Sequence, residues 1–379
     1  MMSSGEGISL VEYFGSLKDP RRPQGRRHNL LDIIAMTICA VVAGAEGWDD
    51  IELFARCKVH WFSRFLELPN GIPCSDTFAR VFARIDPDRF RDCFMEWVSG
   101  VHRLTQGQVI AVDGKTLRRS HDRRAGKEAI HLVSAWASEN SLVLGQTRTE
   151  AKSNEITAIP KLLRLLDVSG CIVSIDAMGC QKEIAQTILD RGADYLLAVK
   201  ENQGRLYEDI RDLFEGAEEA DYEGVPYDYA TTLDKGHGRI ERREGWVISD
   251  PSCLGYLSTG PDWPGLRSVV RVVGRRETDS GTTEQARYYI SSLASEAQRL
   301  LAATRSHWGI ENSVHWVLDV SFREDESRVR TGNAPENMAI MRHAALNLLR
   351  HDQDSKISIK ARRKLAAWDN DYLLSILAI

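Results

Sequence analysis

Several features of other protein classes are missing from this sequence of 379 residues. Its seven cysteines are an odd number and contain no CxxC pair, which favours free thiols in a reducing compartment over a disulfide framework or a zinc site. The longest apolar stretch, residues 30–45, carries Asp32 and falls short of the roughly 20 residues that a membrane helix needs. The N-terminus does not resemble a signal peptide. We therefore predict a cytoplasmic protein.

A strong excess of one charge is also missing, because 49 Lys and Arg stand against 54 Asp and Glu. The basic residues are nevertheless concentrated in segments 16–28, 115–127 and 356–364, whereas eight acids and only Arg211 as a base lie in 206–223. Any one basic segment is often no more than solvated surface. Three of them on one chain predict a polyanionic partner.

Hydrophobic spacing divides the chain into several parts and predicts the α/β class. Short apolar strands alternate with helices in a mixed sheet that has helices on its faces. A β-rich stretch interrupts this sheet, and a helical module precedes it. The expected divisions are 1–105 (helical), 106–204 with 293–350 (mixed α/β core), 205–292 (β-rich insertion) and 351–379 (basic C-terminal tail).

Two acids occupy matching places in the predicted core. Asp113 follows the apolar run 109–112, and Asp176 follows the apolar run 171–175. Groups at the carboxyl ends of strands line the binding crevice of open α/β sheets, and two carboxylates that meet there repel each other unless a cation intervenes. Oxygen ligands favour Mg²⁺ or Mn²⁺ over zinc. A simpler interpretation stays open, in which Asp113-Gly114 opens a turn and Asp176 only ends a strand.

Glu311 is the candidate for a third acid. It lies in the string HWGIEN (307–312), on a helix expected from residue 296 to about 318. Such a helix, crossing the sheet edge, would bring Glu311 beside both aspartates. The alternative is a solvent-facing glutamate. Asp319, Glu324 and Asp325 are competing acids that the sequence does not exclude.

Short strings along almost the whole chain carry a family resemblance. In order they are DPR (19–21), HNL (28–30), GA (44–45), Trp48, GIPCSDTF (71–78), VDGK (112–115), Arg118, SIDAM (174–178), KENQ (200–203), GHGRIE (236–241), HWGIEN (307–312), HW (315–316), LDV (318–320) and FRED (322–325). Together they resemble the ISAs-type (H-repeat-associated) insertion-sequence transposases. This family belongs to the DDE group, which has a ribonuclease-H-like catalytic core.

The resemblance implies a function and a set of site residues. The catalytic acids and metal ligands would be Asp113, Asp176 and Glu311, holding two Mg²⁺ or Mn²⁺ ions. The enzyme would bind transposon ends through its N-terminal domain, cleave DNA and join 3′-hydroxyl ends to target DNA by two-metal phosphoryl transfer. Because two ends must be held together, a dimer on DNA is expected.

Positively charged and amide side chains are the expected DNA contacts, mainly to phosphates. They are Lys115, Arg118, Arg119, Lys200, Asn202, Gln203, His237, Arg239, Arg305, His307, Arg21, Arg22, Arg26 and Arg27. The wider group often has Tyr, Arg and Lys around the glutamate, where this chain has Thr304, His307 and Leu318. The tryptophans Trp246, Trp308 and Trp316 are expected to pack in the core rather than to stack on bases.

Three other functions remain open on the sequence. One is a metal-dependent nuclease with the same core that cuts DNA without joining it. Another is a catalytically inactive DNA-binding remnant of a mobile element. A small-molecule enzyme that uses carboxylates and Mg²⁺ is the third, although the chain has no P-loop and no GxGxxG after a strand to support a nucleotide substrate.

Overall fold

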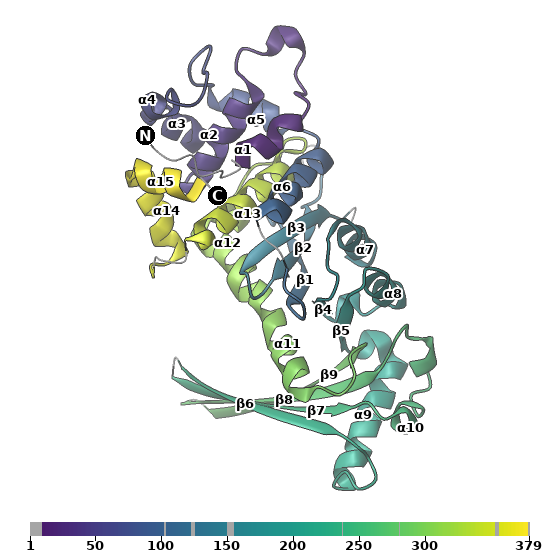
Figure 1. Cartoon of the computed structure of the whole chain (residues 1–379). Coiled ribbons are helices and arrows are strands. Elements are labelled where there is room, and N and C mark those ends of the chain that lie inside the picture. Colours follow the sequence, from purple (N-terminus) through teal and green to yellow (C-terminus); the bar gives the residue numbers. More distant parts are fainter. Residues whose placement is uncertain are drawn as a thin grey trace.

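A computed structural model describes the fold of most of the chain. The described residues are 10–101, 104–122, 126–149, 155–236, 238–279, 281–352 and 356–377. From one end of the molecule to the other lie a group of N-terminal helices, a mixed sheet with helices beside it, and a set of long twisted strands (Figure 1). The α/β class and the helical N-terminal part are therefore confirmed.

The N-terminal part is built from helices that pack around one apolar helix, α2. Its helices are α1 (Leu10–Tyr13), α2 (Leu30–Val42), α3 (Trp48–Cys57), α4 (Val59–Phe62), α5 (Ser75–Phe82) and α6 (Pro87–Val101). Every residue of α2 except Leu31 is buried. A helix that is apolar on all sides is stable only when other elements surround it, so α2 forms the centre of this part.

The central sheet begins with five strands in ribonuclease-H-like order. They are β1 (Val109–Thr116), β2 (His131–Ala137), β3 (Leu142–Arg148), β4 (Ile172–Ile175) and β5 (Asp194–Val199). β1, β2 and β3 are antiparallel neighbours, whereas β4 pairs parallel with both β1 and β5. Helices α7 (Glu155–Leu165) and α8 (Lys182–Asp190) connect the later strands. The apolar runs 109–112 and 172–175 are buried throughout, as expected for central strands with helices on both faces.

The β-rich stretch continues this sheet instead of forming a separate one. It contains α9 (Gly204–Glu219), β6 (Asp228–Gly236), β7 (Arg239–Ile248), α10 (Pro251–Leu254), β8 (Ser268–Thr278) and β9 (Gly281–Ser291). β9 pairs antiparallel with β5, with Leu197 opposite Ile290. The result is one nine-stranded sheet in the order β3-β2-β1-β4-β5-β9-β8-β7-β6.

The last part of the chain returns to the core and to the N-terminal helices. Its elements are α11 (Ala297–Gly309), a π-helical segment η7 (Ile310–His315), α12 (Trp316–Ser321), α13 (Ala334–His351), α14 (Ile359–Trp368) and α15 (Asn370–Leu377). α13 packs against α2, α6 and β3. Where the sequence suggested a basic tail, the described residues 356–377 form two helices with Leu373 and Ile376 buried. None of the described helices combines the length and the apolar character of a membrane span.

Candidate active site

The two predicted aspartates lie side by side at the end of the parallel strand pair. Val112 of β1 pairs with Ile175 of β4, so the next residue on each strand is an aspartate, Asp113 and Asp176. The expectation that both acids meet at one sheet edge is confirmed in this register. The interpretation of Asp113-Gly114 as a turn is wrong, because β1 continues to Thr116 and pairs with β2 beyond Asp113.

Gly114 is required by close packing rather than by a turn. A Cβ atom there would lie 2.5 Å from Glu155 Oε1 and 2.6 Å from His131 Nε2. These two groups contact each other at 2.5 Å, and the other ring nitrogen of His131 contacts Thr116 Oγ1 at 2.8 Å. Sequence reasoning missed Glu155 because it opens α7, far from any motif. Its carboxylate is a fourth acid close to Asp113.

Glu311 reaches Asp113 from the helical region that follows β9. It lies in the π-helical segment η7, a kind of helix distortion that is rare and often found at functional sites. The ring of His315, from the same segment, contacts both acids: its Nδ1 is 2.9 Å from Glu311 Oε2 and 3.5 Å from Asp113 Oδ2. The ligand atoms of these three residues lie within 4.8 Å of one another, which is close enough for them to share one metal ion.

The electrostatics of the site raise the proton affinity of Asp113. Burial raises the pKa of this carboxyl to about 6, with further contributions from Asp176 and Glu155. His315 and the amide of Gly114, which donates to Asp113 Oδ1 at 2.8 Å, act in the opposite direction. A carboxylate held among other carboxylates is destabilised when it is ionised. A divalent cation would relieve this repulsion.

The competing acids Asp319 and Glu324 form ion pairs with basic side chains. Lys115 Nζ lies 2.5 Å from Asp319 Oδ1 and 2.9 Å from Glu324 Oε2, and Arg342 contacts Glu324 from the other side at 3.4 Å. Lys115 and Arg342 lower the pKa of Glu324 to about 2, although burial alone would raise it. These acids therefore neutralise buried cations. The expectation that Lys115 contacts DNA is corrected, because its ammonium points into this cluster.

The loop after Asp176 is held in place by two amides that were expected to contact DNA. Asn202 Nδ2 donates to the carbonyl of Ala177 at 2.6 Å, and Gln203 Nε2 donates to the carbonyl of Cys180 at 2.8 Å. Within the loop, the amides of Met178 and Gly179 donate to Asp176 Oδ1. Asn202 and Gln203 thus support the loop that follows Asp176. Asn202 is also exposed and Gln203 is partly exposed, so their expected contact with DNA stays a prediction.

Comparison with known proteins identifies the family of this chain. The family described as "Transposase DDE domain" matches residues 104–348, and its associated N-terminal family matches residues 11–98. This chain belongs to the DDE transposases. "Putative transposase YncI" of Escherichia coli O157:H7 is 43% identical over 373 residues, which cover 98% of this chain and 94% of the relative. "H repeat-associated putative transposase YhhI" of E. coli K12 is 41% identical over 97% of both chains. These relatives confirm the ISAs type. A piggyBac transposase in a synaptic complex with hairpin DNA has a TM-score of 0.43 and 12% identity over 97% of this chain and 76% of its own.

The arginines predicted on the N-terminal part of this transposase family member differ in their availability. Arg21 is buried and donates to both carboxylate oxygens of Asp19 and to the carbonyl of His28, so its expected role in DNA binding is corrected. Arg26 donates to the carbonyl of Arg21 but keeps an exposed side chain. Arg22 and Arg27 are exposed.

The remaining predicted contacts lie mostly on the surface. Arg119 and Lys200 are exposed, and Arg118 is exposed while pairing with Asp325 at 3.1 Å. His307 is half-buried near Asp176, and burial lowers its pKa despite the nearby carboxylate. His237 lies outside the described residues.

A groove rich in arginine ends at residues close to Glu311 in the sequence. It runs over β7, β8 and β9 and along α11, and it ends at Trp308 and Asn312, which flank Glu311 in the sequence. Its seven arginines, here called the arginine groove, are Arg239, Arg242, Arg243, Arg275, Arg276, Arg287 and Arg305. Sequence reasoning missed Arg275, Arg276 and Arg287, because strand alternation alone does not tell which face of an added strand is exposed.

The expectation that Trp308 and Trp316 pack in the core is wrong. Trp308 is 48% exposed and Trp316 is 58% exposed, on either side of Glu311 in the sequence. The guanidinium of Arg287 lies over the Trp308 ring, 4.5 Å from its centroid. Trp246 is partly buried and packs against Tyr229 and Arg271. Two tryptophans within five residues of Glu311 in the sequence therefore expose part of their rings.

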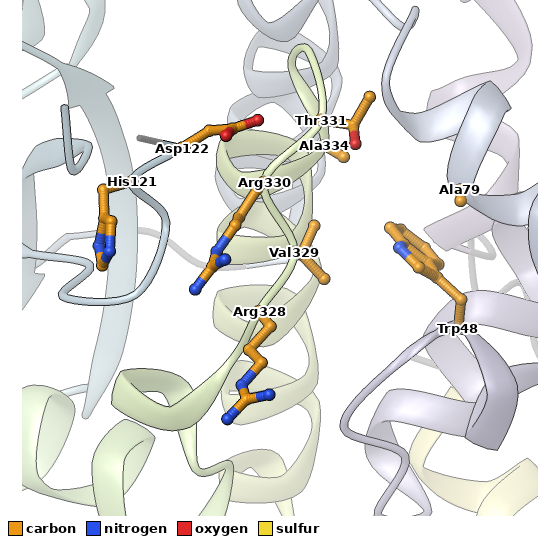
Figure 2. Close-up of a pocket in the computed structure, with 9 residues that line it drawn as sticks. All are labelled: Trp48, Ala79, His121, Asp122, Arg328, Val329, Arg330, Thr331 and Ala334. Atoms are coloured by element: carbon orange, nitrogen blue, oxygen red, sulfur yellow. The ribbon is translucent and has the colours of Figure 1, made fainter. Parts of the chain in front are cut away.

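A second hollow lies between the N-terminal helices and the core. Trp48 of α3 and Ala79 of α5 form one wall, and His121 lies opposite. Arg328 and Arg330 come from the extended segment between them (Figure 2). Arg330 Nε donates to the carbonyl of Arg119 at 2.9 Å, which ties this segment to the loop after β1. The hollow thus marks the junction between the two family-matched regions.

Proposed function

We propose that the chain is the transposase of a bacterial insertion sequence. It binds the transposon ends, cleaves DNA there and joins the exposed 3′-hydroxyl groups to target DNA. The observation that carries this proposal is the convergence of three acids from distant segments: Asp113 and Asp176 follow paired residues of adjacent strands, and Glu311 lies beside Asp113 although 135 residues separate it from Asp176.

The three acids would hold two Mg²⁺ or Mn²⁺ ions. Carboxylate oxygens are the ligands that these cations prefer. Burial above all, with smaller contributions from Asp176 and Glu155, raises the pKa of Asp113, and a bound cation would stabilise its ionised form. When bound, the ions would neutralise the scissile phosphate and activate the attacking water or 3′-hydroxyl group. Asp113 lies next to both other acids, so its carboxylate would take part in holding the ions. Asp176 is oriented by the amides on its Oδ1, which leaves Oδ2 for a ligand.

The arginine groove would guide DNA to the acids. Most of its arginines pair with carboxylates of the same strands, for example Arg239 with Glu241 and Arg242 with Glu244, so these pairs also hold the guanidinium groups in place. Phosphate contacts of this kind position a duplex without reading its sequence. The N-terminal helical domain, with Arg22 and Arg27 exposed, would bind the transposon ends, and two copies would hold the paired ends as a dimer.

The test is a cleavage and strand-transfer assay with Mg²⁺ or Mn²⁺ and DNA that carries the ends flanking this reading frame. We expect cleavage and joining by the native chain and the loss of both in Asp113→Asn and Glu311→Gln, with end binding retained. Glu326→Gln is a matched control, because Glu326 is exposed and pairs with Arg323 alone among the described residues.

The outcomes separate the proposal from its rivals. Cleavage without any joined product would replace the transposase by a nuclease. Binding of the ends without either reaction, unchanged in Asp113→Asn, would identify a catalytically inactive remnant. Cleavage that survives Asp113→Asn would overturn the assignment of the acids.

A further inference from the structure

The imidazole of His315 contacts two of the three proposed catalytic acids, Asp113 and Glu311. A triad of three acids gives this histidine no role. Resting on the proposed metal site, we propose that His315 is itself a ligand of one of the ions, through its Nδ1 atom. The ion shared by Asp113 and Glu311 then has one nitrogen and two carboxylate donors from the protein.

The distances are those of neighbouring ligands on one ion. Nδ1 of His315 is 2.9 Å from Glu311 Oε2 and 3.5 Å from Asp113 Oδ2. Around an octahedral cation with bonds of about 2.1 Å, adjacent ligand atoms are roughly 3 Å apart. One ion can therefore lie within bonding distance of all three atoms after small side-chain movements.

The polar contacts of the His315 ring within the described part of the chain are made by Nδ1 with the two acids. The His315 side chain is only 6% exposed, and its Nε2 has no hydrogen-bond partner among the described residues. Its polar contacts within that part of the chain are thus the two carboxylates. Because Glu311 and His315 are four residues apart in the π-helical segment, the backbone places both donors on the side facing Asp113.

An imidazole donor changes which cation the site prefers. Nitrogen ligands suit Mn²⁺ better than Mg²⁺, which demands oxygen donors and releases its water reluctantly. The rival explanation is an imidazolium that hydrogen-bonds both carboxylates and never touches a metal. In that case the bound ion would have oxygen donors only, and the two explanations give different spectra.

The experiment is pulsed electron paramagnetic resonance of Mn²⁺ bound to the full-length chain. A directly bonded imidazole gives a ¹⁴N coupling on the Mn²⁺ signal, and we expect this coupling in the native protein. It should disappear in His315→Gln and persist in His60→Gln, an exposed histidine of α4. Metal titrations of the same proteins should show the Mn²⁺/Mg²⁺ affinity ratio falling by about tenfold or more in His315→Gln.

Each result decides one question. Binding of Mn²⁺ without ¹⁴N coupling in the native chain overturns the role of His315 and leaves the proposed transposase function standing. A coupling that survives in His315→Gln also overturns it. If the native chain binds no Mn²⁺, or binds it equally after Asp113→Asn, both the role of His315 and the carboxylate site are overturned. The native spectrum needs no variant, so a misfolded variant does not prevent the test.

Discussion

Replacing Glu311 and Glu324 by glutamine should have opposite consequences, although the sequence treats both as acids of one short region. Glu311 is 58% exposed and lies beside the buried carboxyl of Asp113, so its neutralisation removes repulsion and should leave stability unchanged or slightly higher. Glu324 is 2% exposed and lies between Lys115 and Arg342. When Glu324 is neutralised, the buried cations Lys115 and Arg342 lose the negative charge that lies between them.

The size of the Glu324 effect follows from this burial. Breaking a buried ion pair by removing one partner costs about 3–5 kcal/mol, and glutamine keeps the volume of glutamate, so the loss of charge is the cause. Because Asp319 remains 2.5 Å from Lys115, we expect the loss in free energy of unfolding to lie toward the lower end of this range. For a chain of 379 residues that unfolds as one unit, the unfolding entropy of about 2 cal/mol/K per residue converts this loss into a fall in melting temperature of roughly 4–6 °C.

The assay is urea unfolding followed by tryptophan fluorescence, combined with the cleavage assay. We expect Glu311→Gln to unfold like the native chain and to lose cleavage, and Glu324→Gln to unfold at lower urea concentrations. The pH dependence provides a second signature. Because the pKa of Glu324 is lowered to about 2 from an ordinary value near 4.5, its contribution is complete above 4.5 and is lost as pH falls toward 2. The difference in free energy of unfolding between the native chain and Glu324→Gln should therefore become smaller as pH falls from 4.5 toward 2. A Glu324→Gln variant within 1 kcal/mol of the native chain would refute the reasoning.

Three further predictions concern other parts of the molecule. Gly114→Ala should lower the free energy of unfolding by about 1–3 kcal/mol and reduce cleavage, as measured by denaturation and cleavage assays, because its Cβ would collide with Glu155 and His131. Arg287→Ala should reduce the slope of log affinity against log salt by about 0.9 in DNA-binding titrations. The buried Arg21, changed in the same way, should leave that slope unchanged and lower the melting temperature instead. Truncation after residue 352 should cost at least about 3–6 kcal/mol in urea unfolding, because it removes the buried side chains of Leu373 and Ile376. A truncated chain with native stability would show that α14 and α15 are dispensable.

The parts of the fold that could be predicted from sequence are those in which successive residues are all buried in the same way. The apolar runs at 109–112 and 171–175 are buried on both faces, so their composition identified them as central strands and placed Asp113 and Asp176 at their ends. The choice of Glu311 over Glu324 was not available from such patterns. It depends on which way a helix turns its side chains, and a π-helical segment shifts that direction locally.

The DNA contacts were harder to predict for a related reason. A basic residue in a loop can bind a phosphate of DNA outside the fold or pair with a carboxylate inside it, and its sequence context is the same in both cases. Arg21 pairs with Asp19, which is two residues away in the sequence. Lys115 pairs with Asp319 and Glu324, which are 204 and 209 residues away. Nothing in local composition distinguishes these from the exposed Arg22. The arginine groove was equally hidden, because it forms only when three strands and α11 lie together.

The path of the chain between Asp176 and Glu311 explains how a long insertion leaves the site intact. β5 begins the excursion, and β9 ends it as the direct neighbour of β5, so the chain leaves and re-enters at the same edge of the five-stranded core. α11 then starts beside this edge and packs back across β5, β4 and β1 (Figure 1). The apolar residues Leu300 and Leu301 of α11 share a buried cluster with Val109 of β1 and Ile172 of β4, which fixes the helix against the two strands that carry the aspartates. Glu311, just beyond this packed segment, is positioned by contacts with the core. α11 also packs against the inserted strands β6 and β7, because Ala230 and Val247 belong to the same buried cluster. Substitutions of the exposed arginines of the groove, which leave this packing in place, should therefore alter DNA binding without moving Glu311.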